Sequence, residues 1–190
     1  MQTGDDKPQI IIETGFSMLH AERSEDGSFR LTGHPGILNA LWSVPSTLRE
    51  VIHNPVDHPT SYQRLFPSTY LDEKKEKEHR RLIGEAMQER QLAKIALFER
   101  ILTDSGEGMG VLRIRERDFD AFVALLTDMR LVLADMLGVE DEEWEEHLSE
   151  EQMLQDPRVQ LLHLMAGVQQ LLLDATGMVS DLEIDPETDL

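Results

Sequence analysis

Residues 119–138 read FDAFVALLTDMRLVLADMLG, and this stretch decides the fold class. Its large apolar side chains recur at alternating intervals of three and four residues, which is the spacing of one face of an α-helix. They are Phe119, Phe122, Leu126, Met129, Leu133 and Met136. Gly138 follows the pattern as the kind of residue that typically ends a helix. The stretch therefore predicts an amphipathic helix over residues 117–137.

A second apolar stretch follows Asp156 and Pro157, a pair typical of an N-cap and the first position of a helix. From there to residue 175 the apolar side chains fall on nearly every helical face. A helix that is hydrophobic all round is usually buried. We therefore predict a helix over residues 157–175 at the centre of the molecule.

Two more helices are predicted upstream. Apolar residues at 37, 41, 44, 48 and 51 share one face of a helix over residues 36–54, in which Pro45 marks a kink or a tight break. The prolines of residues 54–67 predict a loop. A long helical pattern then covers residues 72–103, and its apolar face begins only at Leu82. We expect its charged first turns, which Asp72 would cap, to project into solvent.

The N-terminal part predicts a β-hairpin over residues 16–32, because Ser-Glu-Asp-Gly at 24–27 separates two strand-like runs. Val111 to Arg115 alternates apolar and basic residues and would add a third strand. The fold class that follows is mainly α: a helical bundle of four to five helices with a small N-terminal β-hairpin. We expect one domain over residues 9–177, a disordered N-terminus at 1–8 and an acidic disordered tail at 178–190.

The charge of the chain is strongly acidic and uneven. The 190 residues carry a net charge of −19, with eight acids in residues 140–151 and five in 181–189, and neither segment holds Lys or Arg. Such a field repels nucleic-acid phosphates and anionic membranes, so we expect no membrane binding and disfavour nucleic acid as a partner. The acidic segments favour solubility, and docking of a basic partner is the alternative.

The composition also bears on the compartment. The chain has no cysteine, which excludes disulfides and thiolate zinc sites within it. The N-terminus lacks the basic-then-apolar pattern of a signal peptide, and no apolar run approaches the roughly 18 residues of a membrane span. We therefore expect a cytoplasmic protein.

The residues that carry most enzyme chemistry form no recognisable constellation. None of the seven histidines is spaced four residues from another, and Glu76 with His79 matches a di-iron motif only once, in a stretch charged on all sides. Glycines at 106, 108 and 110 match a phosphate-binding fingerprint only weakly. We expect no catalytic residue, no metal and no cofactor.

Arg130 stands out in the apolar helix over residues 117–137, where it lies between Met129 and Leu131. A partly buried guanidinium without a counter-charge would be costly. We therefore predict a structural ion pair between Arg130 and an acid on another helix.

Two stretches resemble a known family. One is Arg64-Leu65-Phe66-Pro67 followed by Tyr70 and Asp72, and the other is LTDMRLVLADMLGV at residues 126–139. Together they resemble DUF2017, a bacterial family of unknown function, over roughly residues 28–176. This chain has Thr127 where the family tends to have Asn, and Ala134 where it tends to have Gly. The resemblance implies a helical protein of similar length, without established enzyme activity, and some members have been linked to transcriptional regulation.

The functional expectation is a non-enzymatic regulatory or protein-interaction domain, with a protein partner or a second copy of the chain. Arg64, Phe66 and Tyr70 are the expected contact residues, because Arg and Tyr are enriched at interface hot spots. The alternative for Phe66 and Tyr70 is that they only plug the end of the bundle.

Two other function classes remain open. A transcription regulator would read DNA through the start of the helix over residues 72–103 or through Arg113, Arg115 and Arg117. A small metal- or ligand-binding enzyme is the less favoured alternative.

Overall fold

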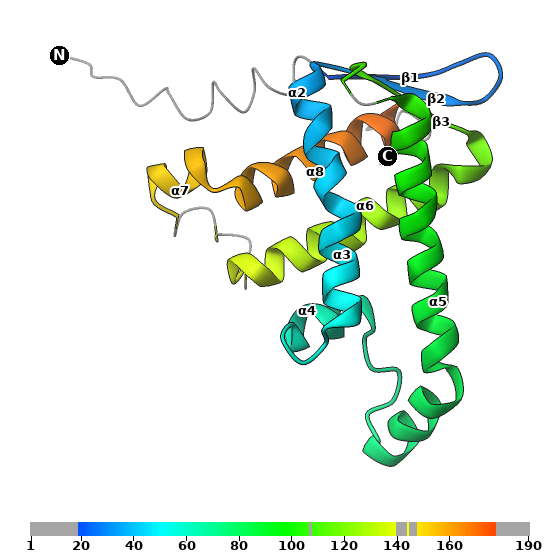
Figure 1. Cartoon of the computed structure of the whole chain (residues 1–190), viewed down its shortest axis with the longest axis vertical. Helices are drawn as coiled ribbons and strands as arrows, with labels where there is room; N and C mark the ends of the chain where they lie inside the picture. The colour runs from blue at the N-terminus through cyan, green and yellow to red at the C-terminus, as the bar shows by residue number, and fades with distance from the viewer. Residues whose placement is uncertain (1–18, 107, 140–143, 145–147, 178–190) are drawn as a thin grey trace, which may run out of the picture.

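The computed structural model describes residues 19–106, 108–139, 144 and 148–177, and Figure 1 shows their arrangement. The fold is mainly α-helical with a small sheet near the N-terminus, as predicted. The predicted tails at 1–8 and 178–190, and most of the acidic segment 140–151, lie outside the described residues. The elements are β1 His20–Arg23, β2 Phe29–Thr32, α2 Pro35–Leu38, η1 Asn39–Trp42, α3 Ser43–His53, α4 Pro59–Leu65, α5 Glu73–Ser105, β3 Val111–Ile114, α6 Glu116–Leu137, α7 Glu150–Gln155 and α8 Pro157–Asp174.

Helix α6 is the centre of the molecule. It packs against α3, α4, α5, α8 and β3, and its predicted apolar face is buried except for Met136, which is partly buried. Gly138 ends the helix in the left-handed conformation, with φ of 70°, which glycine adopts without strain.

The expectation that residues 157–175 form the central helix is wrong. Helix α8 packs on α6, α7 and β1, and four of its five buried side chains follow one face. These four are Leu164, Met165, Val168 and Leu172, and the fifth, Val159, lies in the first turn of the helix. Leucines away from this face, such as Leu162 and Leu173, are half-buried. The described elements cover only part of the surface of α8. A helix with apolar residues on nearly every face therefore lies at the side of the core here and not at its centre.

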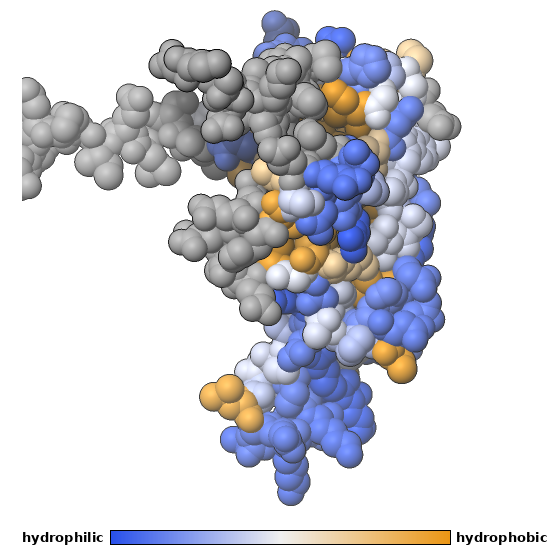
Figure 2. All heavy atoms as spheres, turned by 90° about the vertical axis from the view of Figure 1, so that its left-hand side faces the viewer, coloured by the Kyte–Doolittle hydropathy of each residue, from blue (hydrophilic) through white to orange (hydrophobic). Residues whose placement is uncertain are grey.

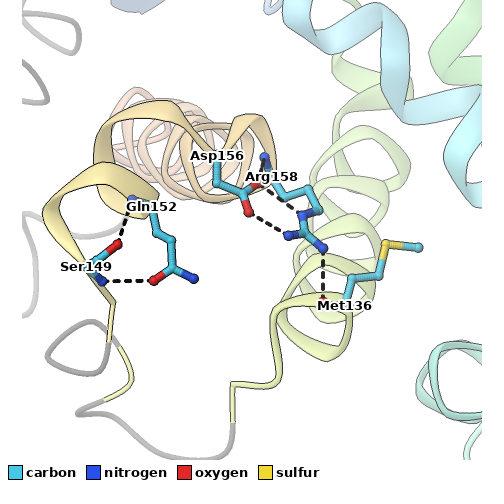
Figure 3. Close-up of polar contacts among 5 residues, drawn as sticks. All are labelled: Met136, Ser149, Gln152, Asp156 and Arg158. Carbon is cyan, nitrogen blue, oxygen red and sulfur yellow. Dashed lines mark hydrogen bonds and ion pairs between the residues drawn. The ribbon is translucent and has the colours of Figure 1, made fainter.

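The starts of α7 and α8 are fixed by side-chain caps (Figure 3). Ser149 and Gln152 form a reciprocal capping box at α7. Asp156 caps α8 as predicted, and its carboxylate also accepts hydrogen bonds from the Arg158 guanidinium at 2.6 and 3.0 Å. The Arg158 side chain, with backbone N–H donors, lowers the pKa of Asp156 to about 2. Because Arg158 also donates to the Met136 carbonyl at 3.3 Å, it links the start of α8 to the end of α6.

The predicted hairpin and third strand form one antiparallel sheet in the order β1-β2-β3. Residues 16–18 of the predicted hairpin lie outside the described part. Phe29 pairs with Ile114 across β2 and β3, and both face the core. Phe29 also contacts the ring of Phe119 on α6 at 4.1 Å, so an aromatic pair joins the sheet to the central helix.

The region predicted as one helix over residues 36–54 consists of α2, η1 and α3. Pro45 lies in the first turn of α3, where a residue without a backbone N–H loses no helical hydrogen bond. The chain passes through the 3₁₀ turn η1 before α3 begins, so the tight break precedes the proline. Leu41, Val44 and Leu48 are fully buried across it.

The prediction of a loop over residues 54–67 is wrong, because Pro59–Leu65 forms the helix α4. Pro59 occupies the first helical position, which suits its fixed backbone angle. Ser61 and Leu65 are buried, and α4 packs against α6. Seven residues are too few to show a helical period, so packing on α6 rather than local pattern stabilises this helix.

Helix α5 confirms the predicted long helix and its N-cap, since Asp72 accepts a hydrogen bond from the Lys75 amide at 2.9 Å. The predicted start of its apolar face is wrong, because Leu82 is 64% exposed and the first buried residue is Gln91. Figure 1 shows the lower end of α5 running past α3 and α4. None of the helices in the described part of the chain has the length and hydrophobicity of a membrane span.

Candidate functional site

The segment between α4 and α5, which carries the predicted contact residues, is tied to the first turns of α5. The Glu76 carboxylate accepts hydrogen bonds from the backbone amides of Thr69 and Tyr70, each at 3.0 Å, and from Arg80 Nε at 2.7 Å. Arg80 also donates to the carbonyl of Phe66. The Arg80 side chain, followed by the Tyr70 amide, lowers the pKa of Glu76 to about 2. Glu76 therefore stays ionised at neutral pH and holds the segment in place.

The predicted contact residues fall in different environments. Phe66 is only 3% exposed and lies 4.7 Å from the Tyr62 ring, so it fills the end of the core as the alternative stated. Tyr70 is 45% exposed and meets the ring of His79 edge-on at 5.2 Å. Arg64 is exposed in the last turn of α4. Two of the three expected contact residues are thus available to a partner.

Arg64 lines a hollow of about 510 Å³ where α4 and the residues after it meet α6. We call this hollow the α4–α6 groove, and its lining consists of Thr60, Gln63, Arg64, Pro67, Ser68, Leu131 and Asp135. Among the described residues, Arg64 forms no ion pair. Leu131 is 40% exposed and, with Pro67, gives the groove an apolar part.

The acid in the groove already has partners. The Oδ2 atom of Asp135 accepts hydrogen bonds from Thr60 Oγ1 at 2.8 Å and Ser61 Oγ at 2.6 Å. These two bonds tie the end of α6 to the start of α4. The groove therefore presents a guanidinium without an ion pair to any described residue, a carboxylate engaged in structural bonds, and two apolar side chains.

The predicted ion pair of Arg130 is wrong for the described part of the chain. Arg130 Nη1 donates to the amide oxygen of Gln169 on α8 at 2.8 Å, and Gln169 donates to Thr127 at 2.9 Å. Asp128, two residues before Arg130, pairs instead with Lys94 on α5 at 2.5 Å. Positions 128 and 130 face different neighbouring helices, and the one that faces α8 meets a neutral amide.

The basic residues considered for nucleic-acid binding lie at the sheet end. Arg113 stands opposite Arg30 on the exposed side of β3 and β2. Arg115 lies 4.0 Å from Asp104, and Arg117 lies 3.9 Å from the carboxylate of the following residue. Arg115 and Arg117 therefore have carboxylates beside them, whereas Arg113 stands opposite another arginine.

The three closely spaced glycines build a turn. Gly106, Gly108 and Gly110 lead from α5 to β3, and all three have positive φ angles. The carbonyl of Gly110 accepts a hydrogen bond from the Gly33 amide at 2.9 Å, and a Cβ at Gly110 would lie 2.6 Å from the Gly33 oxygen. Glycine is required at position 110 by this close approach. Within the described ranges, no group of three or more side chains is arranged to hold a metal ion.

The fold and the groove define a mainly helical domain with an open surface site and a three-stranded sheet. A family model described as "Domain of unknown function (DUF2017)" matches residues 16–176. The chain belongs to this family, as the two quoted stretches predicted. The match begins at residue 16, whereas the predicted resemblance begins at roughly residue 28. No curated protein and no solved structure matches the chain.

Proposed function

We propose that this chain is a non-enzymatic protein-interaction domain that binds its partner in the α4–α6 groove. The observation that carries the proposal is the exposed Arg64, which lines an open hollow without an ion-pair partner in the described part of the chain. Arginine is enriched at interface hot spots, and its planar fork of donors suits a carboxylate. The half-exposed Leu131 beside it supplies apolar area.

The chemistry of the groove indicates the kind of partner. A peptide segment that carries an Asp or Glu near an apolar side chain would satisfy both Arg64 and Leu131. The hydroxyls of Thr60 and Ser68 and the amide of Gln63 add polar contacts at the rim. Asp135 is engaged by two hydroxyl donors, which supports a structural role for this acid over general-base chemistry. In this proposal the domain has a regulatory role in the bacterial cytoplasm.

A photo-crosslinking amino acid placed at Gln63 tests the proposal. We expect a discrete crosslinked product in cells, identified by mass spectrometry, that is lost when Arg64→Glu reverses the charge in the groove. The same crosslinker at Glu89, an exposed position on α5, serves as the control. Arg64 is exposed, so its replacement should change the free energy of unfolding by no more than about 0.5 kcal/mol.

Two results would contradict the proposal. One is a product from Gln63 that persists in the Arg64→Glu variant. The other is the same set of products from Gln63 and Glu89, because this would mean that the groove has no preference over an ordinary exposed helix face.

A further inference from the structure

A second exposed surface lies at the projecting end of α5, away from the groove. We call residues 70–83 the α5 tip, and none of them is buried. Figure 2 shows this lower end of the molecule as largely hydrophilic, with hydrophobic atoms protruding from it. Four of the fourteen residues are large, exposed apolar or aromatic side chains. They are Tyr70, Leu71, Leu82 and Ile83.

The apolar side chains of the α5 tip lie among charged residues of both signs, with five Lys and Arg against four Asp and Glu. Lys75, His79 and Leu82 follow one another at one-turn spacing on α5, and Tyr70 packs against His79. Arg80 and Arg81 are paired with glutamates of the same helix. In contrast, the lysines of the first turns form no ion pair with any described residue. They are Lys74, Lys75 and Lys77.

The chain itself contains a segment of complementary chemistry. Residues 181–189 hold five acids and no Lys or Arg, in a protein whose net charge is −19. The acids alternate with apolar residues in the order Asp181, Leu182, Glu183, Ile184, Asp185. We propose that residues 181–185 dock on the α5 tip of a second copy of the chain, with their carboxylates on the lysines of the first turns and their Leu and Ile side chains on Leu82 and Tyr70.

The length of the chain favours a second copy over the same molecule. Figure 1 shows the C-terminal end of α8 beside the sheet and the upper end of α5, opposite the α5 tip. The helix from Lys77 to Ser105 rises about 42 Å at 1.5 Å per residue. Asp181 to Asp185 lie four to eight residues beyond Gly177, a reach of at most about 29 Å when fully extended. These acids therefore fall short of the α5 tip of their own molecule.

Two other pairings are less favoured by charge or composition. Contact between two α5 tips would bring their free lysines together, and like charges repel. The acidic segment 140–151 of a second copy has the charge but not the regular alternation with apolar residues. Both pairings are outcomes that the experiment separates.

The test uses the full chain in sedimentation-velocity runs over a range of protein concentrations at low salt. We expect self-association that weakens as salt is added, because opposite exposed charges are screened. The tip variant Lys74→Glu, Lys75→Glu and Lys77→Glu, and the tail variant Asp181→Lys, Glu183→Lys and Asp185→Lys, should each raise the dissociation constant by at least about ten-fold. An equimolar mixture of the two variants should restore association, because the lysines in the tail of one variant then meet the glutamates in the α5 tip of the other.

A matched control separates docking from a general effect of charge. The variant Arg113→Glu, Arg115→Glu and Arg117→Glu changes the net charge as much as the tip variant does, but at the opposite end of α5. It should associate as the unmodified chain does, and circular dichroism should show that all variants are folded.

Several outcomes would overturn the inference: a chain that is monomeric at every concentration, a tip variant that associates normally, or a mixture that does not recover. Recovery with Lys substitutions in residues 140–146 instead of the tail would also overturn it and assign the contact to that segment. None of these outcomes depends on Arg64, so failure here leaves the proposal for the α4–α6 groove standing.

Discussion

The two halves of α5 belong to one helix but are held by different forces. The C-terminal half, from Gln91 to Ser105, buries Ile95, Phe98, Ile101 and Leu102 in the core. The N-terminal half, from Glu73 to Arg90, buries no residue, and hydrogen bonds link it to the preceding segment and to α4. The comparison shows that a continuous helix does not imply a continuous core, because backbone hydrogen bonds extend the element past the end of its packing.

The largest effect should come from the packed half. Phe98→Ala removes a fully buried ring that stacks on Phe122 at 4.6 Å, and we expect it to lower the free energy of unfolding by about 3–5 kcal/mol. Leu82→Ala in the projecting half should change it by less than about 0.5 kcal/mol. Urea unfolding followed by circular dichroism measures both. Similar losses for the two variants would break the comparison.

An intermediate effect is expected where the halves meet. Asp128 on α6 accepts from Lys94 at 2.5 Å and Gln91 at 2.6 Å, and the Lys94 and Asp128 side chains are 24% and 18% exposed. Asp128→Ala should cost about 1–3 kcal/mol, because it leaves these partly buried donors without their acceptor. The exposed pair of Glu78 and Arg81 is the control, and Glu78→Ala should cost at most about 0.5 kcal/mol. A cost for Asp128→Ala as small as that of the control would show that this contact does not stabilise the junction.

The smallest effect should be local to the segment held by Glu76. Glu76→Ala removes the acceptor of the Thr69 and Tyr70 amides, and their hydrogen exchange should become roughly ten-fold faster while core amides keep their rates. Glu73→Ala, in the same first turn, is the matched control. Hydrogen exchange read by NMR measures both, and faster exchange in the core with no change at Thr69 would contradict the proposed local role of Glu76.

The same contact has a defined dependence on pH. The folded pKa of Glu76, about 2, lies below its ordinary value of 4.5, so the ionised form is the one that the folded state favours. The protection of Thr69 and Tyr70 should therefore be complete above about pH 4.5 and be lost as the pH falls toward 2. Protection that is unchanged over this range would show that the carboxylate charge is not what holds the segment.

Much of the fold could be predicted because periodic patterns and caps are local. The seam of α6 and the N-caps Asp72 and Asp156 each need only a few neighbouring residues to be recognised. The sequence does not predict helix α4 because this helix is stabilised by packing on α6, a contact that no local pattern displays. The predicted start of the apolar face at Leu82 is wrong because a pattern shows which residues share a face but not where a neighbouring helix ends.

The candidate site can be predicted only in part, because it depends on contacts between residues that are far apart in the sequence. Arg64 was found through its motif, whereas the groove around it depends on α4 lying against Leu131 and Asp135, which are far away in sequence. The prediction of an acidic partner for Arg130 rests only on the apolar residues that surround it in the sequence. Its partner, Gln169, is decided by the rotation of α6 relative to α8, and no local signal carries that information.

The segment that Glu76 and Arg80 hold belongs to both surfaces of this protein. Pro67 and Ser68 line the α4–α6 groove, and the bonded residues Phe66, Thr69 and Tyr70 flank them. A ligand that shifts this segment on entering the groove must therefore work against contacts that position the α5 tip. Thermodynamic linkage then requires that the effect is reciprocal. If binding at one surface changes the affinity of the other by some factor, binding at the other surface changes the affinity of the first by the same factor. Under the two proposals, the Glu76 carboxylate is the group that connects the groove to the α5 tip.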